Sequence, residues 1–551
     1  MSLSDLERLL GVRLSLQDIY RYFTKLKCEI EEIRGDTIVF EANSDRPDHF
    51  SVEGVARAIR PWLGLPRRYY KLTESSVVGY AEKIPWRPYV ALAVVRDLEL
   101  DEHAINQMMQ LQEKIAETYG RRRRKISIGL YDLNLVNPPI YYKLVDPDKT
   151  RYKPLNETKE MSLREVLKKT EKGLLYGHII ENMEKYPVLM DSQNKVLSLV
   201  PVLNSDDCKV TTKTKNILID ATGTSLTDVV NAVTVMSMNI AERSKTGVIE
   251  VVSVYYEDGF LVRAPRAEVE PIEVNLEDVF NLIGSRMPVN YVIELLDKHY
   301  YEVLKIEDSK ILVKPPVYRI DVKSWVDVAE DIAIAYGYDK LGSEADSLPE
   351  SRTTGRLHTI EYVSQKLRDV FIGLGFQEVA NYMLSSRYVQ LELLGSRGKD
   401  VFLVENPRTE RFECLRVWLV PQLLEVVLEN ADKHSRLAIF EVGDVAEPSP
   451  EAETGARIER RIGFALVYEK ATLTDGLAYV KTALRELGIE PVFERGIVEG
   501  FLHERTALVK ACNEEIGFIG EVNPVVLYKL GLKNPVVIAE LSISKIISAC
   551  L

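Results

Sequence analysis

The sequence predicts an α+β protein of several domains, in which a small α/β module occurs twice and a larger α/β domain is inserted between the copies. Three observations lead to this fold class. The 551 residues exceed what one hydrophobic core holds. Short apolar runs with strand character alternate with amphipathic helical patterns. The order of motifs in the first module returns far downstream, as expected for a duplication. We expect domains at residues 1–85, 86–262, 263–345 and 346–551.

Composition and charge narrow the class of protein. The chain is 46% hydrophobic and 28% charged, as in ordinary core-forming proteins, and no apolar run is long enough to span a membrane. It starts without a signal-peptide core, so we expect a cytoplasmic protein. The five cysteines are scattered without a CxxC pair, which predicts neither a disulfide framework nor a zinc site. The net charge of -12 argues against broad coating of nucleic acid but leaves room for a local basic patch.

The duplicated module is recognised by its local patterns. Its first copy has an amphipathic helix near the start, a strand at residues 37–40 and turn residues before a second helix. The second copy repeats this plan, with a strand at residues 311–313. Arg46-Pro47-Asp48 returns as Arg319-Ile320-Asp321 after 319 − 46 = 273 residues. The duplication therefore brackets an insert.

An acidic cluster distinguishes the second copy. Its members are Asp321, Asp327, Glu330 and Asp331. If the chain is helical from about Asp327, the last three acids lie at i, i+3 and i+4 and project from one face. Such an all-oxygen cluster suits Mg²⁺ better than zinc or copper. The alternative is a helix cap with a solvated charged face. Gly54 and Arg57 occupy the first copy's helix, so only the second copy carries the full set.

The insert contains two stretches with functional potential. The run Arg121–Lys125 lies between a predicted helix and a strand that begins at Ile126, and forms either a solvated loop or a contact to a phosphate backbone. Further on, a strand from Ile217 and a helix capped near Ser225 bear several small hydrogen-bonding side chains. Such a wall can position a water or a ligand with an amine and a hydroxyl. Thr-rich strand edges and caps explain it equally well.

The last 200 or so residues predict an antiparallel sheet with amphipathic helices. The chain contains no P-loop, no GxGxxG fingerprint and no GxSxG elbow. Several motifs occur in one order along the whole chain: Ser44–Arg57, Arg319–Asp339, Asn406-Pro407, Leu415–Pro421 and Phe440–Gly443. In this order the sequence resembles the β-subunit family of phenylalanyl-tRNA synthetase, in its archaeal and eukaryotic form. The duplicated modules also resemble small nucleic-acid-binding folds of the winged-helix type, by analogy of fold alone.

The resemblance implies a subunit of phenylalanine–tRNA ligase, which attaches Phe to tRNA(Phe) with ATP as an α₂β₂ heterotetramer. It also implies that the four acids bind Mg²⁺ near the α subunit. The C-terminal domain resembles a class II synthetase core without aminoacylation residues. Ile439 stands where such a core needs an Arg two positions before Glu441, and Glu521 follows Gly520 where a second Arg is needed. Without guanidinium groups on the phosphates, Phe activation falls to the α chain.

The insert resembles the family's editing domain, which hydrolyses Tyr wrongly attached to tRNA(Phe). A pocket for Phe rejects an analogue with one added hydroxyl only about a hundredfold, so a second, hydrolytic site is needed. The candidate editing residues are Asn204, Thr211, Thr214, Asn216, Asp220 and Thr222. No Ser-His-Asp or Cys-His set stands out, which favours a positioned water over a covalent intermediate. The alternative is a free-standing tRNA-editing or RNA-binding factor that works without α.

Overall fold

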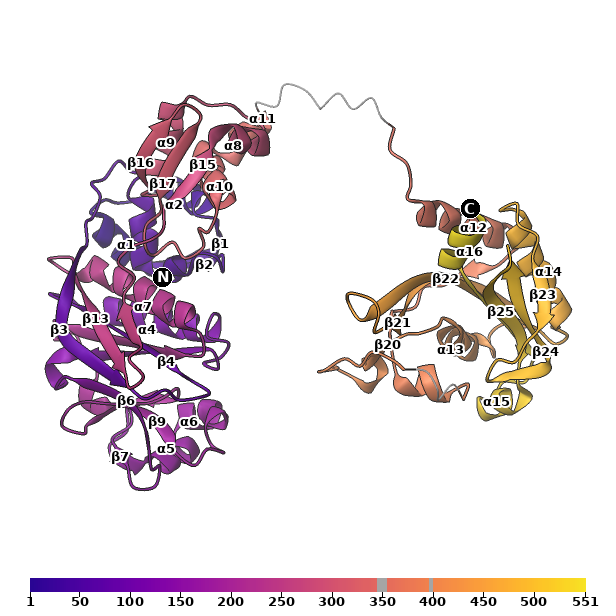
Figure 1. The fold of residues 1–551 in the computed structure, drawn as a ribbon, viewed down its shortest axis with the longest axis horizontal. Helices are drawn as coiled ribbons and strands as arrows, with labels where there is room; N and C mark the ends of the chain where they lie inside the picture. The colour runs from indigo at the N-terminus through magenta and orange to yellow at the C-terminus, as the bar shows by residue number, and fades with distance from the viewer. Residues whose placement is uncertain (344–353, 396–399) are drawn as a thin grey trace. The chain divides into compact units, whose positions relative to one another are not determined.

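A computed structural model describes residues 1–343, 354–395 and 400–551 (Figure 1). The chain divides into two compact units, residues 1–348 and 349–551, which are described separately. The first unit contains both copies of the module and the insert, and the second contains the C-terminal sheet. The predicted boundary between residues 345 and 346 lies outside the described residues.

The first copy of the module has three helices around a two-stranded hairpin. Its elements are α1 (Leu3–Leu10), α2 (Leu16–Lys25), β1 (Cys28–Arg34), β2 (Thr37–Ala42) and α3 (Val52–Ile59). Ser15 and Asp18 form a capping box at the start of α2, which satisfies two backbone N–H groups of the first turn. Leu6, Ile19 and Val55 are fully buried where the three helices meet. The predicted strand and both predicted helices are confirmed.

The second copy repeats this plan around a three-stranded sheet of order β15-β17-β16. Its elements are β15 (Ile272–Asn275), α8 (Leu276–Ile283), α9 (Val289–Asp297), β16 (Glu302–Glu307), β17 (Lys310–Lys314), α10 (Trp325–Tyr336) and α11 (Tyr338–Ser343). The two copies also match where their first helices end. Gly11 after α1 and Gly284 after α8 both take the left-handed conformation, with φ of 75° and 74°. Glycine adopts that conformation without steric cost, so each helix stops there.

The insert is built on a ten-stranded sheet of order β11-β10-β9-β6-β3-β13-β4-β12-β5, with β14 paired to β13. Its strands are β3 (Lys71–Ala81), β4 (Tyr89–Val95), β5 (Ile126–Asp132), β6 (Ile140–Val145), β9 (Tyr186–Met190), β10 (Val196–Leu199), β11 (Leu203–Asn204), β12 (Ile217–Gly223), β13 (Val248–Tyr256) and β14 (Leu261–Ala264). Strand β3 pairs with β13 and β6, although its residues fall within the predicted first domain, 1–85. The sheet therefore begins earlier than the predicted boundary.

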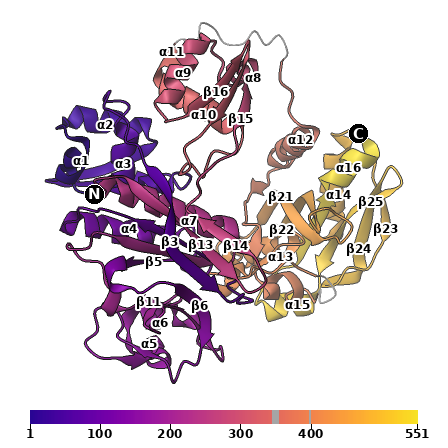
Figure 2. The ribbon, with the colours of Figure 1, turned by 60° about the vertical axis from the view of Figure 1, so that its left-hand side comes forward.

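Four helices accompany this sheet: α4 (Glu102–Glu117), α5 (Leu163–Lys169), α6 (Glu171–Tyr176) and α7 (Leu226–Ile240). Helix α7 packs across β4 and β12, and α4 lies beside it against β5. Helices α5 and α6 lie together at the other end of the insert (Figure 2), with the short hairpin of β7 (Arg151–Tyr152) and β8 (Met161–Ser162).

The C-terminal unit has a seven-stranded sheet of order β18-β21-β22-β26-β25-β24-β23. Its strands are β18 (Gln377–Glu378), β21 (Leu437–Pro448), β22 (Ala456–Val467), β23 (Val492–Arg495), β24 (Phe501–Ala511), β25 (Glu514–Val522) and β26 (Val536–Ser542), and β19 (Leu384–Ser385) pairs with β20 (Cys414–Leu415) outside it. All neighbours in the sheet are antiparallel except β18 and β21. The predicted antiparallel sheet is confirmed apart from this edge.

Helices cover both faces of the C-terminal sheet. They are α12 (Thr359–Gly373), α13 (Val420–Asn430), α14 (Leu473–Arg485), α15 (Pro524–Lys529) and α16 (Ile543–Cys550). One apolar cluster joins the sheet to α12, α14 and α16, and a second joins it to α13 and α15. Strand β26 is buried along its whole length, which explains its nearly continuous apolar run, whereas β22 and β24 carry charged residues where they are exposed.

One expectation about the cysteines is wrong. A disulfide joins Cys512 and Cys550, which are 38 residues apart, while Cys28, Cys208 and Cys414 are buried free thiols. The spacing concealed the pair because the fold brings the β24–β25 turn beside the end of α16. Within the described residues, no helix is long and apolar enough to cross a membrane.

Candidate functional site

A cavity of about 280 Å³ lies in the insert between α4, strands β5 and β12, and the β10–β11 segment. Two of the six predicted editing residues, Asp220 and Asn204, line it. The other polar lining residues were not predicted for this site: Gln112, Glu113, Arg123, Ser127, Lys172 and Ser198. They come from segments far apart in the sequence, and only Arg123, in the basic run 121–125, belongs to a local pattern that stood out. Met109, Val200 and Pro201 contribute apolar wall.

Asp220 is the most perturbed acid in the cavity. It is 3% exposed, and burial raises the pKa of its carboxyl from the ordinary 3.8 to about 7. The Tyr131 hydroxyl donates to its Oδ1 at 2.6 Å and, with the Arg87 charge, opposes part of this effect of burial on the pKa. A carboxyl with a pKa near neutrality can exchange a proton with water at neutral pH. Asp220 therefore has the properties of a general base.

The close approach to Asp220 requires a glycine at position 129. Gly129 faces Asp220 across the β12–β5 ladder. A Cβ on Gly129 would lie 2.1 Å from Asp220 Oδ1 and 2.2 Å from the Tyr131 hydroxyl oxygen, far inside van der Waals contact. Any side chain there would displace the carboxylate or its phenolic donor, so the backbone itself forms this wall of the cavity.

Thr222 lies behind the cavity wall. It is fully buried, and its hydroxyl accepts from Arg87 Nε at 3.0 Å and lies 2.9 Å from the hydroxyl of Ser127. Arg87 also donates to the Thr222 carbonyl at 2.7 Å and to Ser127 at 2.9 Å. Because Ser127 lines the cavity and Thr222 holds it, Thr222 acts on the site through its neighbour.

The remaining three predicted residues do not reach the cavity. Thr214 donates to Asp132 at 2.6 Å, and the Thr211 backbone N–H donates to Thr214 at 3.0 Å. Asn216 donates to Asn134 at 3.2 Å. All three precede the first residue of β12, whereas Asp220 lies at its middle. They tie the start of β12 to the end of β5, and their part in editing stays a prediction.

A charged cluster forms the other side of the cavity. Glu113 accepts from Lys172 and from Arg123, each at 2.7 Å, and the Arg123 guanidinium stacks 4.2 Å from the centre of the Tyr176 ring. Arg123 is buried and also donates to the Val202 carbonyl at 2.8 Å. The basic run 121–125 is therefore not entirely a solvated loop. Its middle residue is a structural part of the cavity, whereas its neighbours on both sides are exposed.

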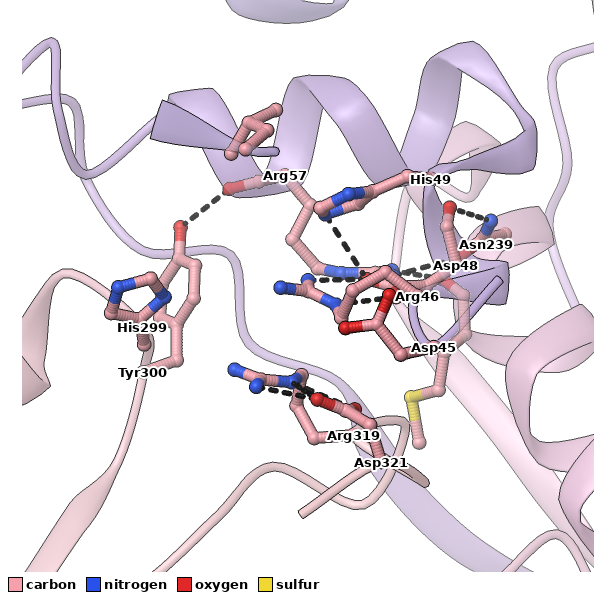
Figure 3. A network of polar contacts seen from close by, with 12 residues as sticks. Asp45, Arg46, Asp48, His49, Arg57, Asn239, His299, Tyr300, Arg319 and Asp321 are labelled. Atoms are coloured by element: carbon pink, nitrogen blue, oxygen red, sulfur yellow. Dashed lines mark hydrogen bonds and ion pairs between the residues drawn. The ribbon is translucent and has the colours of Figure 1, made fainter. Parts of the chain in front are cut away.

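A second polar centre joins the two copies of the module (Figure 3). Arg46 forms a forked pair with Asp48 at 2.9 and 2.8 Å, and Arg319 forms the same fork with Asp321 at 3.0 and 2.7 Å. The repeated tripeptides thus fold alike down to their side chains. Arg319 also binds Asp331 at 2.8 Å, so one guanidinium bridges two carboxylates.

The four predicted metal ligands are not gathered at one point. Although burial opposes it, Arg319 lowers the pKa of Asp331 to about 2 and fixes it inside the fold. Asp327 caps α10 by accepting from the backbone N–H of Ser324 at 2.7 Å, and Glu330 is exposed and pairs with Lys27 at 2.9 Å. Neighbouring helical residues point about 100° apart, so Glu330 and Asp331 face different surroundings. Within residues 1–343, 354–395 and 400–551, no three acidic, His or Cys side chains gather as a metal group.

In the C-terminal unit, the motif residue Glu441 is fully engaged by hydrogen bonds from neighbouring side chains. The Glu441 carboxylate accepts from Arg416 at 2.6 Å and from Asn381 at 2.7 Å. Ile439, two residues earlier, is 5% exposed and belongs to the apolar cluster under α13. The position that would carry a phosphate-binding Arg is thus part of the hydrophobic core.

Comparisons with family models and with known proteins indicate one family along the chain. The model of the phenylalanyl tRNA synthetase beta chain CLM domain matches residues 345–543, and that of the tRNA synthetase B5 domain matches residues 272–338. A relative from Thermofilum pendens, named phenylalanine–tRNA ligase beta subunit, is 37% identical over 555 residues, covering 100% of this chain and 98% of the relative. A relative of the same name from Pyrococcus furiosus is 37% identical over 548 residues, with 98% and 97% coverage.

A solved structure is similar to a large part of this chain. An N-terminal fragment of the phenylalanyl-tRNA synthetase β subunit from Pyrococcus horikoshii is 40% identical, with a TM-score of 0.58, and covers 61% of this chain and 99% of the fragment. The full-length identity to curated relatives, together with the two matched domains, shows that this chain belongs to the phenylalanine–tRNA ligase β-subunit family.

Proposed function

We propose that this chain serves a phenylalanine–tRNA ligase as scaffold, tRNA-binding and editing subunit, and that the cavity around Asp220 hydrolyses Tyr-tRNA(Phe). The observation that carries the editing proposal is a buried carboxyl with a pKa of about 7 on the wall of a 280 Å³ cavity. Asn204 lines the same cavity, and Thr222 supports its Ser127 wall. Thr211, Thr214 and Asn216 support the strand that carries Asp220.

The chemistry needs one water and one base. The Asp220 carboxylate takes a proton from a bound water while the water oxygen forms a bond to the ester carbonyl carbon. The ester bond to the terminal ribose breaks, and the ribose oxygen leaves with a proton as a hydroxyl. The products are free tyrosine and uncharged tRNA. Tyr131 keeps the Asp220 carboxylate oriented by donating at 2.6 Å.

Selectivity for Tyr over Phe follows from the polar lining. Asn204 offers a hydrogen-bonding amide within the cavity, whereas Ser127 is already held by Arg87 and Thr222, and Ser198 donates to the Leu203 carbonyl. A Tyr hydroxyl can pair with the Asn204 amide, which a Phe side chain cannot do. Sites that hydrogen-bond a substrate hydroxyl can reject the analogue without it by about 10⁴-fold or more. The editing site therefore spares correctly charged tRNA.

Phe activation requires a separate α subunit in this proposal. Ile439 lies in the core and Glu441 is bound by Arg416 and Asn381, which leaves this unit without a guanidinium grip on ATP there. ATP and Phe would bind to α in an α₂β₂ enzyme, with this chain in the cytoplasm and in contact with tRNA(Phe). Phe-dependent ATP–pyrophosphate exchange tests this directly. Exchange should be absent with the purified chain and appear when α is added, and exchange by the chain alone would overturn the proposal.

The Mg²⁺ proposal rests on the family resemblance and on the oxygen-rich donor set. Asp321, Asp327, Glu330 and Asp331 do not form a single cage, because the Arg319 guanidinium already lies between Asp321 and Asp331. Asp327 and Glu330, one helical turn apart, are the two members that Arg319 does not bind, and neither is fully buried, so an ion from solvent can reach them. Mg²⁺ commonly binds one or two carboxylates and keeps several waters. No step of the hydrolysis is assigned to it.

A second function is favoured by the position of the cavity. Every residue that lines it lies between Met109 and Asp220, so the editing site is complete within one domain of this chain. The chain could therefore act as a free-standing tRNA-editing factor. Size-exclusion chromatography with and without α, followed by a Tyr-tRNA(Phe) hydrolysis assay on each fraction, separates the two functions. A monomer that hydrolyses Tyr-tRNA and ignores α would establish the second.

A further inference from the structure

A larger cavity, of about 700 Å³, lies between the two copies of the module. We call it the inter-repeat groove. Its walls are α2, Trp62, α9 and the segment from the end of α10 into α11. It is distinct from the editing cavity and shares no lining residue with it. Its size is within the roughly 300–1,000 Å³ of typical ligand sites.

Contacts between the two copies hold the walls of this groove in place. Lys298 donates to the Pro61 carbonyl at 3.1 Å, and the Tyr300 hydroxyl donates to the Arg57 carbonyl at 3.2 Å. Lys27 of the first copy pairs with Glu330 of the second at 2.9 Å. The groove is therefore a built feature of the first unit, formed because the duplicated modules pack against each other.

The groove is cationic in a chain that is acidic as a whole. Its basic lining residues are Arg21, Lys25, Lys27, Lys298 and Lys340, against the two acids Glu294 and Asp339. Lys27 is already paired with Asp45 and Glu330, but the other four basic residues still outnumber the two acids. The chain's net charge is -12, so this local excess runs against the average surface. Burial lowers the pKa of Lys25, which lies 4.5 Å over the centre of the Trp62 ring. An anion beside this ammonium would stabilise its charged form.

Aromatic rings lie among these charges. Trp62, Tyr291, Tyr336 and Tyr338 line the groove, and Tyr338 is 60% exposed. Cations that follow a phosphate backbone, interleaved with rings on which bases stack, are the combination that binds single-stranded nucleic acid. An acidic peptide would use the cations but has no flat groups to match the rings. The groove therefore favours RNA over an anionic protein segment.

We propose that the inter-repeat groove binds a single-stranded stretch of RNA, with phosphates on Arg21 and Lys25 and a base stacked on Tyr338. This inference rests on the proposed function, because the RNA would be the tRNA that the complex charges and edits. It adds a contact site remote from the editing cavity. The site exists only in the packed pair of modules, since each copy supplies one wall.

The test measures RNA binding by the αβ complex with a double charge reversal, Arg21→Glu with Lys25→Glu. The matched control reverses the charge of two exposed lysines of the second copy that lie outside the groove, Lys305→Glu with Lys310→Glu. The probes are a tRNA(Phe) transcript, an unstructured oligouridylate and polyglutamate, each titrated by fluorescence anisotropy over a range of salt. Tyr338→Ala, which alters an exposed side chain, is a second variant that preserves the fold and removes only the stacking surface.

The groove variant should bind tRNA and oligouridylate at least about tenfold more weakly at low salt, with a salt slope shallower by roughly 0.7 for each lost phosphate contact. Tyr338→Ala should weaken binding by about fivefold or more, as the loss of one stacked base predicts. The control should bind like wild type. Wild-type affinity in Tyr338→Ala, wild-type affinity and salt slope in the charge-reversal variant, or polyglutamate binding as tight as that of oligouridylate would each overturn the proposal. Phe-dependent pyrophosphate exchange by the wild-type complex tests the proposed function separately.

Discussion

The hydroxyl oxygen of Tyr131 lies 2.6 Å from a carboxylate oxygen of Asp220, and this hydrogen bond lowers the pKa that burial has raised. The balance between burial and this hydrogen bond sets the pH range in which Asp220 is ionised and the cavity can hydrolyse an ester. Hydrolysis needs the ionised carboxylate, so the single-turnover rate of Tyr-tRNA(Phe) hydrolysis should rise with pH through a midpoint near the Asp220 pKa of about 7.

Replacing Tyr131 by Phe should move this midpoint to higher pH. The variant loses the donor that stabilises the carboxylate, so the pKa of Asp220 rises further and hydrolysis at pH 7 falls. At high pH the rate should recover most of its wild-type value. A pH–rate profile of single-turnover deacylation measures the shift. An unchanged midpoint would mean that another group supplies the base.

Asp220→Asn should abolish editing and stabilise the protein at neutral and alkaline pH. The folded pKa of Asp220 is raised from 3.8 to about 7, so the wild type loses stability as pH rises between these values. The Asn side chain cannot ionise, so the variant does not lose this stability. The difference in free energy of unfolding between the variant and the wild type should be absent at pH 4 and grow to at most about 4 kcal/mol above pH 7. Urea unfolding at pH 4, 6 and 8 measures it, and a destabilised variant at pH 8 would contradict the raised pKa.

Gly129→Ala should disable editing without touching the catalytic side chain. The new methyl would overlap Asp220 Oδ1 and the Tyr131 hydroxyl, so one of them must move. A displacement of about 1 Å in a catalytic group can cost about a hundredfold in rate. Deacylation of Tyr-tRNA(Phe) is the measurement. Gly373→Ala is the matched control, because a Cβ at Gly373 meets nothing within 4 Å. Full activity in Gly129→Ala would remove Asp220 from the active site.

Arg319→Met should destabilise the first unit strongly. It leaves the carboxylates of Asp321 and Asp331 without their shared cation, one of them fully buried. Breaking such a buried network by removing one partner costs roughly 3–5 kcal/mol. Arg286→Met, which breaks an exposed pair with Glu277, should cost less than about 1 kcal/mol. Chemical denaturation compares the two, and equal effects would argue against a structural role for the buried bridge.

Asp327→Asn tests the magnesium proposal. If Asp327 and Glu330 hold the ion, calorimetry should show weaker Mg²⁺ binding, and assembly with α should loosen. The substitution also alters the cap of α10, so thermal stability without Mg²⁺ is measured alongside. Unchanged Mg²⁺ affinity would mean that the acids have structural roles only. Asp327 would cap α10, Glu330 would pair with Lys27 at the surface, and Asp321 and Asp331 would bind Arg319.

Local patterns in the sequence determined most of the secondary structure. The capping box at Ser15, the strand at residues 37–40 and the glycines that end α1 and α8 depend on neighbours a few residues away. The duplication could be found because each copy repeats these local signals. Asp220 was identified because it lies in a strand flanked by small polar residues.

Tertiary structure alone decided which of these residues meet. Thr211 and Thr222 are close in sequence, yet Thr211 lies in the turn before β12 and Thr222 lies near the end of that strand. Glu113 and Lys172, by contrast, converge on one cavity from separate helices. Asp331 appeared as a metal ligand, but its partner is Arg319, which the turn before α10 places inside the fold. The reason is physical: periodicity fixes the direction of a side chain within its own element, whereas charge pairing, burial and the resulting pKa depend on residues that only packing brings near.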